Sequence, residues 1–558
     1  MRRWVLTALF WNLVSAEQTV LQTEPKHVST APFIFNSLSG LLTQWPNTVH
    51  PNGHSIVPGI LHPFTLLYHA REDPDLPPSP EWLAYDPEMS FAIMVTRGGP
   101  TYLATYRTLA PANVVYFDGM SAAWGPGWLD SQHMFLYGAS PDANKDIQWW
   151  DDYGRAEKLC EWAKARNVDG IVRMNAGFEV IWCDFSSPKL QLVSHLNITP
   201  PGTPEASKLP RWPPGRFHDI PLFDEDERPE RVLDRAPPGE DDRRPPPRGP
   251  GGGERGPPRR PSRPRISELA LTSNLEWVRA ASHRSFSPQP HLTVFPAGMV
   301  TYYHPRLTSL LPDRKADRND LPMRAHRLVN ISDNDARSVV EEFDSVLARS
   351  FGNGSGMDWT GTALSIVEYW GTRVSHMHAL LLNASEPTAN ITASLPSIRT
   401  LAYTLINPYM QPGSYPDASG WELFFGSSGV GNVTALDRCI HQTTAFLSEL
   451  KHLQTPQEAL LQESIETVLK RLCNDFGTIF AESSDLVQQP IIGLVLQWLK
   501  RIEALMQWLD WSVWLRCNEV CPRDYVCSTP VWPIAWMFRR PGEETDDDLK
   551  PRCIRMAV

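Results

Sequence analysis

Three side chains in the first third of the chain are of types that can act together on a sugar-like substrate: His69, Tyr85 and Glu179. A transfer at a sugar carbon passes through a cation-like species, and a nearby carboxylate stabilises the positive charge that develops. A histidine can donate to sugar hydroxyls, and an aromatic face can hold a planar ring. The simpler interpretations are a core histidine with satisfied hydrogen bonds and a glutamate on the solvent face of a strand.

Four segments carry these residues in a recognisable order. They read GILHPFTLLYHA (59–70), PEWLAYDPEMS (80–90), GPTYLATYRTLAP followed by NVVYFDG (99–119), and NVDGIVRMNAGFEVIWCDFS (167–186). This order resembles the ADP-ribosyltransferase-like fold, whose strands carry LYHG(T/S), a W-F-(S/A)-x-D-P segment, a D-G-I segment and E-(V/Y)-(V/I)-x-F-D. Position 70 is Ala where that pattern often has Gly, and 118–150 is an insertion relative to it.

The resemblance implies a role for each residue. His69 would hydrogen-bond the nicotinamide ribose of NAD, and Glu179 would support the ribosyl cation. Tyr85, or in its place Trp82, would stack on nicotinamide. The implied activity is an ADP-ribosyltransferase or NAD glycohydrolase, or a relative that has lost it, with NAD as substrate.

The first 16 residues have the layout of a secretory signal peptide. Arg2 and Arg3 precede a short apolar stretch, and Val14-Ser15-Ala16 is a small-residue cleavage signal. A membrane span needs about 20 apolar residues, and charged side chains interrupt the most apolar later stretch, 491–515. We therefore expect a secreted, extracellular protein with no transmembrane segment.

Cysteine and asparagine patterns agree with secretion. The eight cysteines are an even number, which in an oxidising compartment predicts four disulfides: Cys160, Cys183, Cys439, Cys473, Cys517, Cys521, Cys527 and Cys553. We expect the local pairs Cys160–Cys183 and Cys439–Cys473, and two bonds among the last four. The C-x3-C-x5-C spacing is not that of most zinc sites, and no metal site is predicted. Six N-x-S/T sequons predict glycosylation: Asn197, Asn330, Asn353, Asn383, Asn390 and Asn432.

The net charge of the chain limits the classes of partner that it is expected to bind. The net charge is −11, and it becomes −13 without Arg2 and Arg3. An acidic protein is a poor candidate for binding nucleic acid. Glycan or protein at a cell surface remains as the partner class.

The chain is long enough for more than one domain. Residues 199–265 are rich in proline, arginine and glycine and should form a disordered linker. Residues 30–198 are expected to form an α+β domain with an ADP-ribosyltransferase-like core. Residues 266–558 carry apolar stripes at helical spacing and predict a mostly α-helical, disulfide-bonded domain.

A second function class stays open beside the enzyme. The motif Trp149-Trp150-Asp151-Asp152 joins aromatics to carboxylates, as in sites that bind or cleave glycans. A non-catalytic extracellular or cell-wall protein would present an exposed row of tryptophans, for instance Trp124, Trp128, Trp149 and Trp150. The segments QWPNTVHPNGHSIVPG and CNEVCPRDYVCSTPVWPIAW are similar to uncharacterised secreted proteins of filamentous fungi. That resemblance implies no activity.

Overall fold

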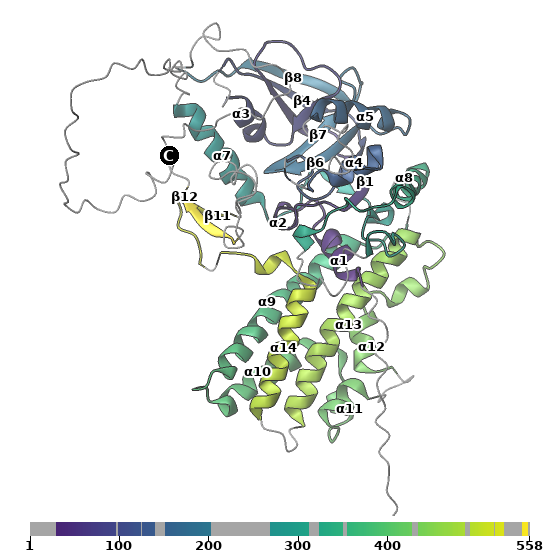
Figure 1. The fold of residues 1–558 in the computed structure, drawn as a ribbon, viewed down its shortest axis with the longest axis vertical. Coiled ribbons are helices and arrows are strands. Elements are labelled where there is room, and N and C mark those ends of the chain that lie inside the picture. Colours follow the sequence, from purple (N-terminus) through teal and green to yellow (C-terminus); the bar gives the residue numbers. More distant parts are fainter. Residues whose placement is uncertain are drawn as a thin grey trace, which may run out of the picture.

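The computed structural model describes most of the chain outside its N-terminus and the region around the predicted linker. The described residues are 29–95, 99–123, 125, 127–139, 151–201, 203, 268–311, 323–349, 354–426, 433–485, 491–517, 519–528 and 550–555. They form an α/β part built on a mixed sheet and a mostly helical part (Figure 1).

The strands of the large sheet run in the order β10-β1-β5-β6-β7-β3-β2-β4-β8, and β9 also pairs with β1. Only the β5–β6 pair is parallel among the described pairs. The bounds are β1 (Ser55–Leu61), β2 (Leu66–Arg71), β3 (Glu81–Ala84), β4 (Tyr102–Thr108), β5 (Ala112–Phe117), β6 (Gly170–Asn175), β7 (Gly177–Trp182), β8 (Leu190–Asn197), β9 (Leu292–Val294) and β10 (Val300–Thr301).

Burial along the strands follows from what covers the sheet. Strands β6 and β7 are buried at every position, as expected for strands packed on both faces. Strand β8 lies at the edge, and most of its residues are exposed or half-buried. The central strands are therefore the part of the sheet that can hold a shielded site.

Different helices cover the two faces. On one face, Val172 and Val180 join a core that reaches into the helical part through Phe35. On the other face, Ile171 and Ile181 pack in a core with residues of α4 (Asp130–Tyr137), α5 (Asp152–Lys164) and α8 (Asp333–Ala348). Alternate residues of one strand therefore enter two separate cores.

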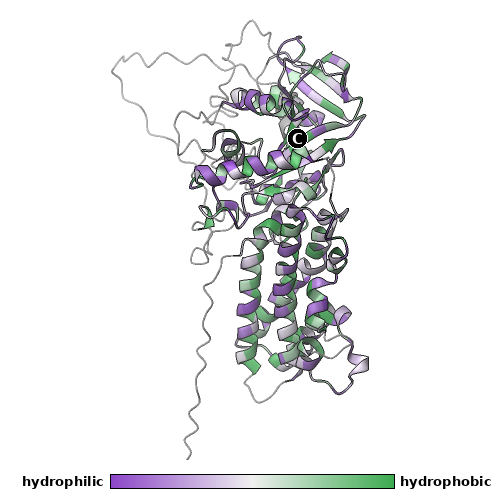
Figure 2. Cartoon of the chain, turned by 90° about the vertical axis from the view of Figure 1, so that its right-hand side faces the viewer, coloured by the Kyte–Doolittle hydropathy of each residue, from purple (hydrophilic) through white to green (hydrophobic). Residues whose placement is uncertain are grey.

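The helical part is built around the long helix α13. Its helices are α9 (Trp359–Ser385), α10 (Ile391–Ile406), α11 (Gly420–Phe425), α12 (Ala435–His441), α13 (Pro456–Ser484) and α14 (Ile491–Leu509). Thr455 and Glu458 form a capping box that starts α13, and Asp358 caps α9. Figure 2 shows apolar and polar residues alternating along these helices, as one-sided packing requires.

Elements that precede the predicted linker and elements that follow it are interleaved in space. Helix α1 (Ala31–Ser39) packs on α9, α13 and α14 of the helical part. In return, β9 and β10, which follow the predicted linker, pair with β1. Helices α2 (Gln44–Val49), α3 (Pro87–Val95) and α7 (Glu268–Arg284) lie between the two parts or on the flank of the sheet (Figure 1).

The disulfides confirm the local pairing expected from the sequence. Cys160 bonds Cys183, and Cys439 bonds Cys473. The last four cysteines pair as Cys517–Cys527 and Cys521–Cys553, beside the small sheet of β11 (Tyr525–Ser528) and β12 (Arg552–Arg555). Within the described residues, no helix combines the length and apolar character that a bilayer crossing demands.

Candidate functional site

His69 lies on β2 where that strand separates from β3. Only Tyr68 and Ala84 are in register between the two strands. The Nδ1 atom of His69 lies 2.7 Å from the carbonyl oxygen of Trp82, so the ring donates there. Burial lowers the pKa of His69 to about 4, and the imidazole is therefore neutral near neutral pH. This side-chain hydrogen bond joins β2 to β3 at a position where the backbones of the two strands are not paired.

Tyr85 follows β3 and belongs to the core. Its backbone N–H donates to the carbonyl of Phe178 at 3.1 Å, and its side chain is 5% exposed. Burial raises the pKa of its hydroxyl, which has no hydrogen-bond partner among the described residues. The ring packs among apolar side chains instead of offering a face to a ligand.

Glu179 lies on β7 and is held by Arg173 of the neighbouring β6. Its Oε1 accepts from Arg173 Nη2 at 2.7 Å and from Nε at 3.2 Å. Burial raises the pKa of Glu179, against the pull of Arg173. The carboxylate is thus part of a buried ion pair.

The register separates Glu179 from the other two residues. Glu179 pairs with Ala84, and Ala84 pairs with Tyr68, so these three side chains share one face of the sheet. His69 follows Tyr68 and faces the other way. Tyr85 lies with the core on the His69 side. The structure does not bring the three predicted residues together in one cleft.

A buried cluster of charges surrounds Glu179, and the sequence reasoning missed it. Arg173 also donates to Asp152 at 3.1 and 3.3 Å and to Gln132 at 3.3 Å. Burial pushes the pKa of Asp152 up, but Arg173 and Arg155 outweigh it and hold that pKa below its usual range. Arg155 forms an ion pair with Asp152.

His133 of α4 closes the cluster on the helix side. Its Nε2 lies 3.2 Å from Arg155 Nη1 and accepts from it. Burial and the neighbouring guanidinium lower the pKa of His133 to about 3, so the ring stays neutral. Two signals could have found the cluster. Arg173 is a charged residue in the apolar strand GIVRMN, and Asp152 and Arg155 share one turn of a helix.

Glu81, Trp82 and Tyr153 form the outer edge of this cluster. The rings of Trp82 and Tyr153 meet edge to face with centroids 4.6 Å apart, and Arg173 Cζ lies 6.0 Å from the Trp82 ring. The Tyr153 hydroxyl is 3.4 Å from Glu81 Oε2. Burial raises the pKa of Glu81 to about 7, and Arg71, 3.9 Å away, opposes that shift. This carboxyl can therefore hold or release a proton near neutral pH.

The remaining predicted residues fall into two groups. The side chains of Asn197, Asn330, Asn383 and Asn390 are exposed, as glycan acceptors must be, whereas Asn353 and Asn432 lie outside the described residues. Of the predicted tryptophan row, Trp128 is half-buried against the core, and Trp124, Trp149 and Trp150 lie outside the described residues.

Comparisons with known proteins find similar proteins in a fungus. Two uncharacterised proteins of Saccharomyces cerevisiae (strain ATCC 204508 / S288c), YOR389W and YPL277C, are each 31% identical to the chain over 32% of its length. The match covers 36% of YOR389W and 47% of YPL277C, so the chain spans less than half of either relative. No solved structure matches the chain.

The family comparison agrees with these relatives. Residues 23–99 and 97–214 match the model described as the YPL277C N-terminal domain. The predicted resemblance to uncharacterised fungal proteins is thereby confirmed, and the resemblance to ADP-ribosyltransferases stays a hypothesis. The N-terminal part of this chain thus resembles an uncharacterised fungal family, that of the YPL277C N-terminal domain.

Proposed function

We propose that the protein is a secreted glycoprotein that binds glycan at the fungal cell surface without altering it, through the edge formed by Tyr153, Trp82 and Glu81. The observation that carries this proposal is the Tyr153 ring. It is 43% exposed and rests against Trp82. An exposed aromatic ring suits sugars, because their apolar faces can stack on it.

The chemistry around Tyr153 supports recognition of a neutral polyhydroxylated ligand. The Glu81 side chain is buried and positions the ring from below the surface: its Oε2 accepts from the Tyr153 hydroxyl at 3.4 Å, and Arg71 lies 3.9 Å from that carboxyl. The Arg173 guanidinium lies over the Trp82 ring, and its positive charge is paired with the carboxylates of Asp152 and Glu179. A fixed aromatic platform with satisfied charges binds a ligand at little entropic cost.

The placement of the predicted catalytic residues favours binding over NAD chemistry. Glu179 is engaged by Arg173, and His69 is engaged by the Trp82 carbonyl on the opposite face of the sheet. A transferase would need both groups around one substrate. The NAD-using enzyme is therefore the competing function.

Secretion is supported by three features together. All eight cysteines are paired. The four described sequon asparagines are exposed, and the first 16 residues have the layout of a signal peptide.

The binding test uses purified full-length protein and insoluble cell-wall polysaccharides, namely β-1,3-glucan, chitin and mannan. The wild-type protein should sediment with one of them. Tyr153→Ala should weaken that binding by about tenfold, which is ~1.4 kcal/mol. Trp421→Ala is the matched control, because Trp421 is 44% exposed and lies on α11 in the helical part. Equal losses in both variants, or no sedimentation of the wild type, would reject the glycan site.

The NAD test separates the two function classes. Nicotinamide release from NAD is followed for the wild type and for Glu179→Gln. The binding function predicts no release from either protein. Release by the wild type that disappears in Glu179→Gln would establish the enzyme and overturn our proposal.

A further inference from the structure

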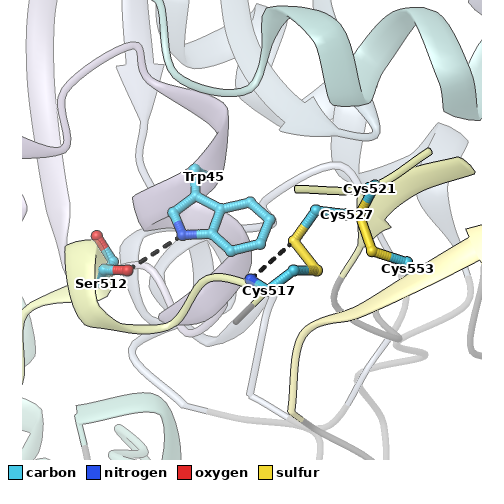
Figure 3. The surroundings of a disulfide bond; sticks show 6 residues. All are labelled: Trp45, Ser512, Cys517, Cys521, Cys527 and Cys553. Carbon is cyan, nitrogen blue, oxygen red and sulfur yellow. Dashed lines mark hydrogen bonds between the residues drawn. A yellow bond between two sulfur atoms is a disulfide. The ribbon is translucent and has the colours of Figure 1, made fainter. Parts of the chain in front are cut away.

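Four cysteine sulfurs gather at one point beside the C-terminal hairpin (Figure 3). The Sγ atoms of Cys517, Cys521 and Cys527 all lie within 4.8 Å of one another, although Cys521 is bonded to neither of the others. Cys553, the partner of Cys521, stands directly opposite Cys527 across the β11–β12 ladder. Each disulfide therefore lies within reach of a sulfur of the other.

These cysteine residues are also more exposed than the pair in the helical part. All four C-terminal cysteines are half-buried. By contrast, Cys439 and Cys473 are 2% and 0% exposed. A dissolved thiol must touch a disulfide sulfur in order to attack it, so the C-terminal pairs are open to thiols and the Cys439–Cys473 pair is shielded.

One hydrogen bond makes the cluster asymmetric. The backbone N–H of Cys517 donates to Cys527 Sγ at 3.1 Å (Figure 3). A donor aimed at sulfur stabilises the thiolate, and a stabilised thiolate leaves faster when its disulfide is attacked. Attack on Cys517 Sγ should therefore expel Cys527.

We propose that this cluster is a thiol-reactive site at which a small thiol catalyses exchange between two disulfide pairings. The thiolate attacks Cys553 Sγ, and the Cys521–Cys553 bond breaks to release the Cys521 thiolate. Cys521 then attacks Cys517 Sγ and expels the Cys527 thiolate. Cys527 attacks Cys553 Sγ and expels the small thiolate. Two disulfides are present before and after, and the thiol is regenerated.

The product pairing fits the backbone without rearrangement of the hairpin. Directly opposed residues of antiparallel strands have Cα atoms about 4.5 to 5.5 Å apart, within the usual range for disulfides. A Cys527–Cys553 disulfide would link β11 to β12 covalently and keep their present register. A Cys517–Cys521 bond would close a small loop.

The exchange would release the hairpin from its anchor. The chain entering Cys517 is held to α2, because Trp45 Nε1 donates to the Ser512 carbonyl at 3.1 Å (Figure 3). Arg516 also lies over the Phe286 ring at 4.6 Å. Both present disulfides tie the hairpin to this anchored segment. After exchange, what would hold it within the described residues is the main chain and the small apolar contact of Val526 and Ile554 with Val278 of α7.

Peptide mapping gives a direct test. Oxidised full-length protein is treated with millimolar reduced glutathione, alkylated and digested with trypsin. Cleavage after Arg516, Arg523 and Arg552 puts Cys517 and Cys521 on one peptide and the other two cysteines on separate peptides. The present pairing joins all three peptides. The exchanged pairing yields peptide 517–523 free and internally bonded, and we expect that product to appear while Cys439–Cys473 stays intact.

A single variant tests the central step without added thiol. Cys553→Ser leaves Cys521 as a thiol beside the Cys517–Cys527 bond, and we expect some molecules to form the Cys517–Cys521 bond spontaneously. Cys183→Ser is the matched control, since its free Cys160 is 8% exposed and remote in sequence from the cluster. Glutathione adducts without the internally bonded peptide, or Cys521 fully alkylated in Cys553→Ser, would overturn the proposal.

Discussion

His69 and Glu179 point to opposite faces of one sheet, although the chain order made them partners in one predicted site. Glu179 shares its face with Ala84 and Tyr68, and His69 is the next residue along β2. Because side chains alternate along a strand, one step in register decides which core a residue enters. Glu179 instead enters a buried charge cluster with Arg173 and Asp152.

Removing Arg173 should strongly destabilise the protein. Arg173→Met leaves Glu179 and Asp152 as buried carboxylates without their shared guanidinium, at a cost of about 3 to 5 kcal/mol in the free energy of unfolding. Urea denaturation measures the loss. Arg279→Met is the control, because the Arg279–Glu276 pair is exposed and should contribute under about 1 kcal/mol. Similar losses in both variants would contradict the structural role of the cluster.

We expect the titration of Glu81 to make the free energy of unfolding depend on pH. Burial raises its folded pKa to about 7, above the unfolded value, so the folded state binds the proton more tightly. Its contribution to stability is complete below the unfolded pKa, near 4.5, and is lost as pH rises through 7. The loss is about 3 kcal/mol.

Glu81→Gln should reduce the dependence of the free energy of unfolding on pH. We expect the variant to lose less stability than the wild type between pH 4.5 and 7. Part of the slope should remain, because burial also raises the pKa of Asp118 to about 7. Urea unfolding across this pH range makes the comparison. Parallel curves for the two proteins would show that Glu81 titrates normally.

Cutting the chain between β8 and α7 should leave the two pieces associated. Strands β9 and β10 pair with β1, and α1 packs on α9, α13 and α14. No disulfide joins the pieces, since each of the four lies on one side of the cut. With a protease site inserted in 204–267, cleaved protein should elute as one species by size exclusion and give two bands on a non-reducing denaturing gel.

Phe35→Ala tests what holds the pieces. Phe35 is fully buried in the core that α1 shares with the helical part, and its loss should cost about 3 to 5 kcal/mol. The cleaved variant should separate at lower urea concentration than the cleaved parent. Separation of the parent itself in buffer would refute the interleaved arrangement.

Local signals in the sequence were sufficient for several features. The apolar residues Val339 and Phe343 are spaced as on one face of a helix, and α8 forms there with Ser332 as its cap. The β-branched and aromatic residues around Glu179 are typical of a strand, and β7 forms there. Short spacing made Cys160–Cys183 and Cys439–Cys473 the natural pairs.

The candidate site depended on contacts that spacing does not encode. Asp152 and Arg173 are 21 residues apart and meet because α5 packs across β6. Tyr153 and Trp82 are 71 residues apart in the printed sequence, and their contact depends on the same packing. No periodicity within one segment predicts such a pair.

Residue types, the segments that form helices and strands, and the even set of cysteines can be read along the chain. Three relations come from the packing of the folded chain: His69 and Glu179 face apart, Arg173 joins Glu179 to Asp152, and α1 enters the helical part. The physical reason is that helix and strand signals are local, with periods of 3.6 and 2 residues. Strand order, register and the choice of covering helix follow from burying all apolar faces at once.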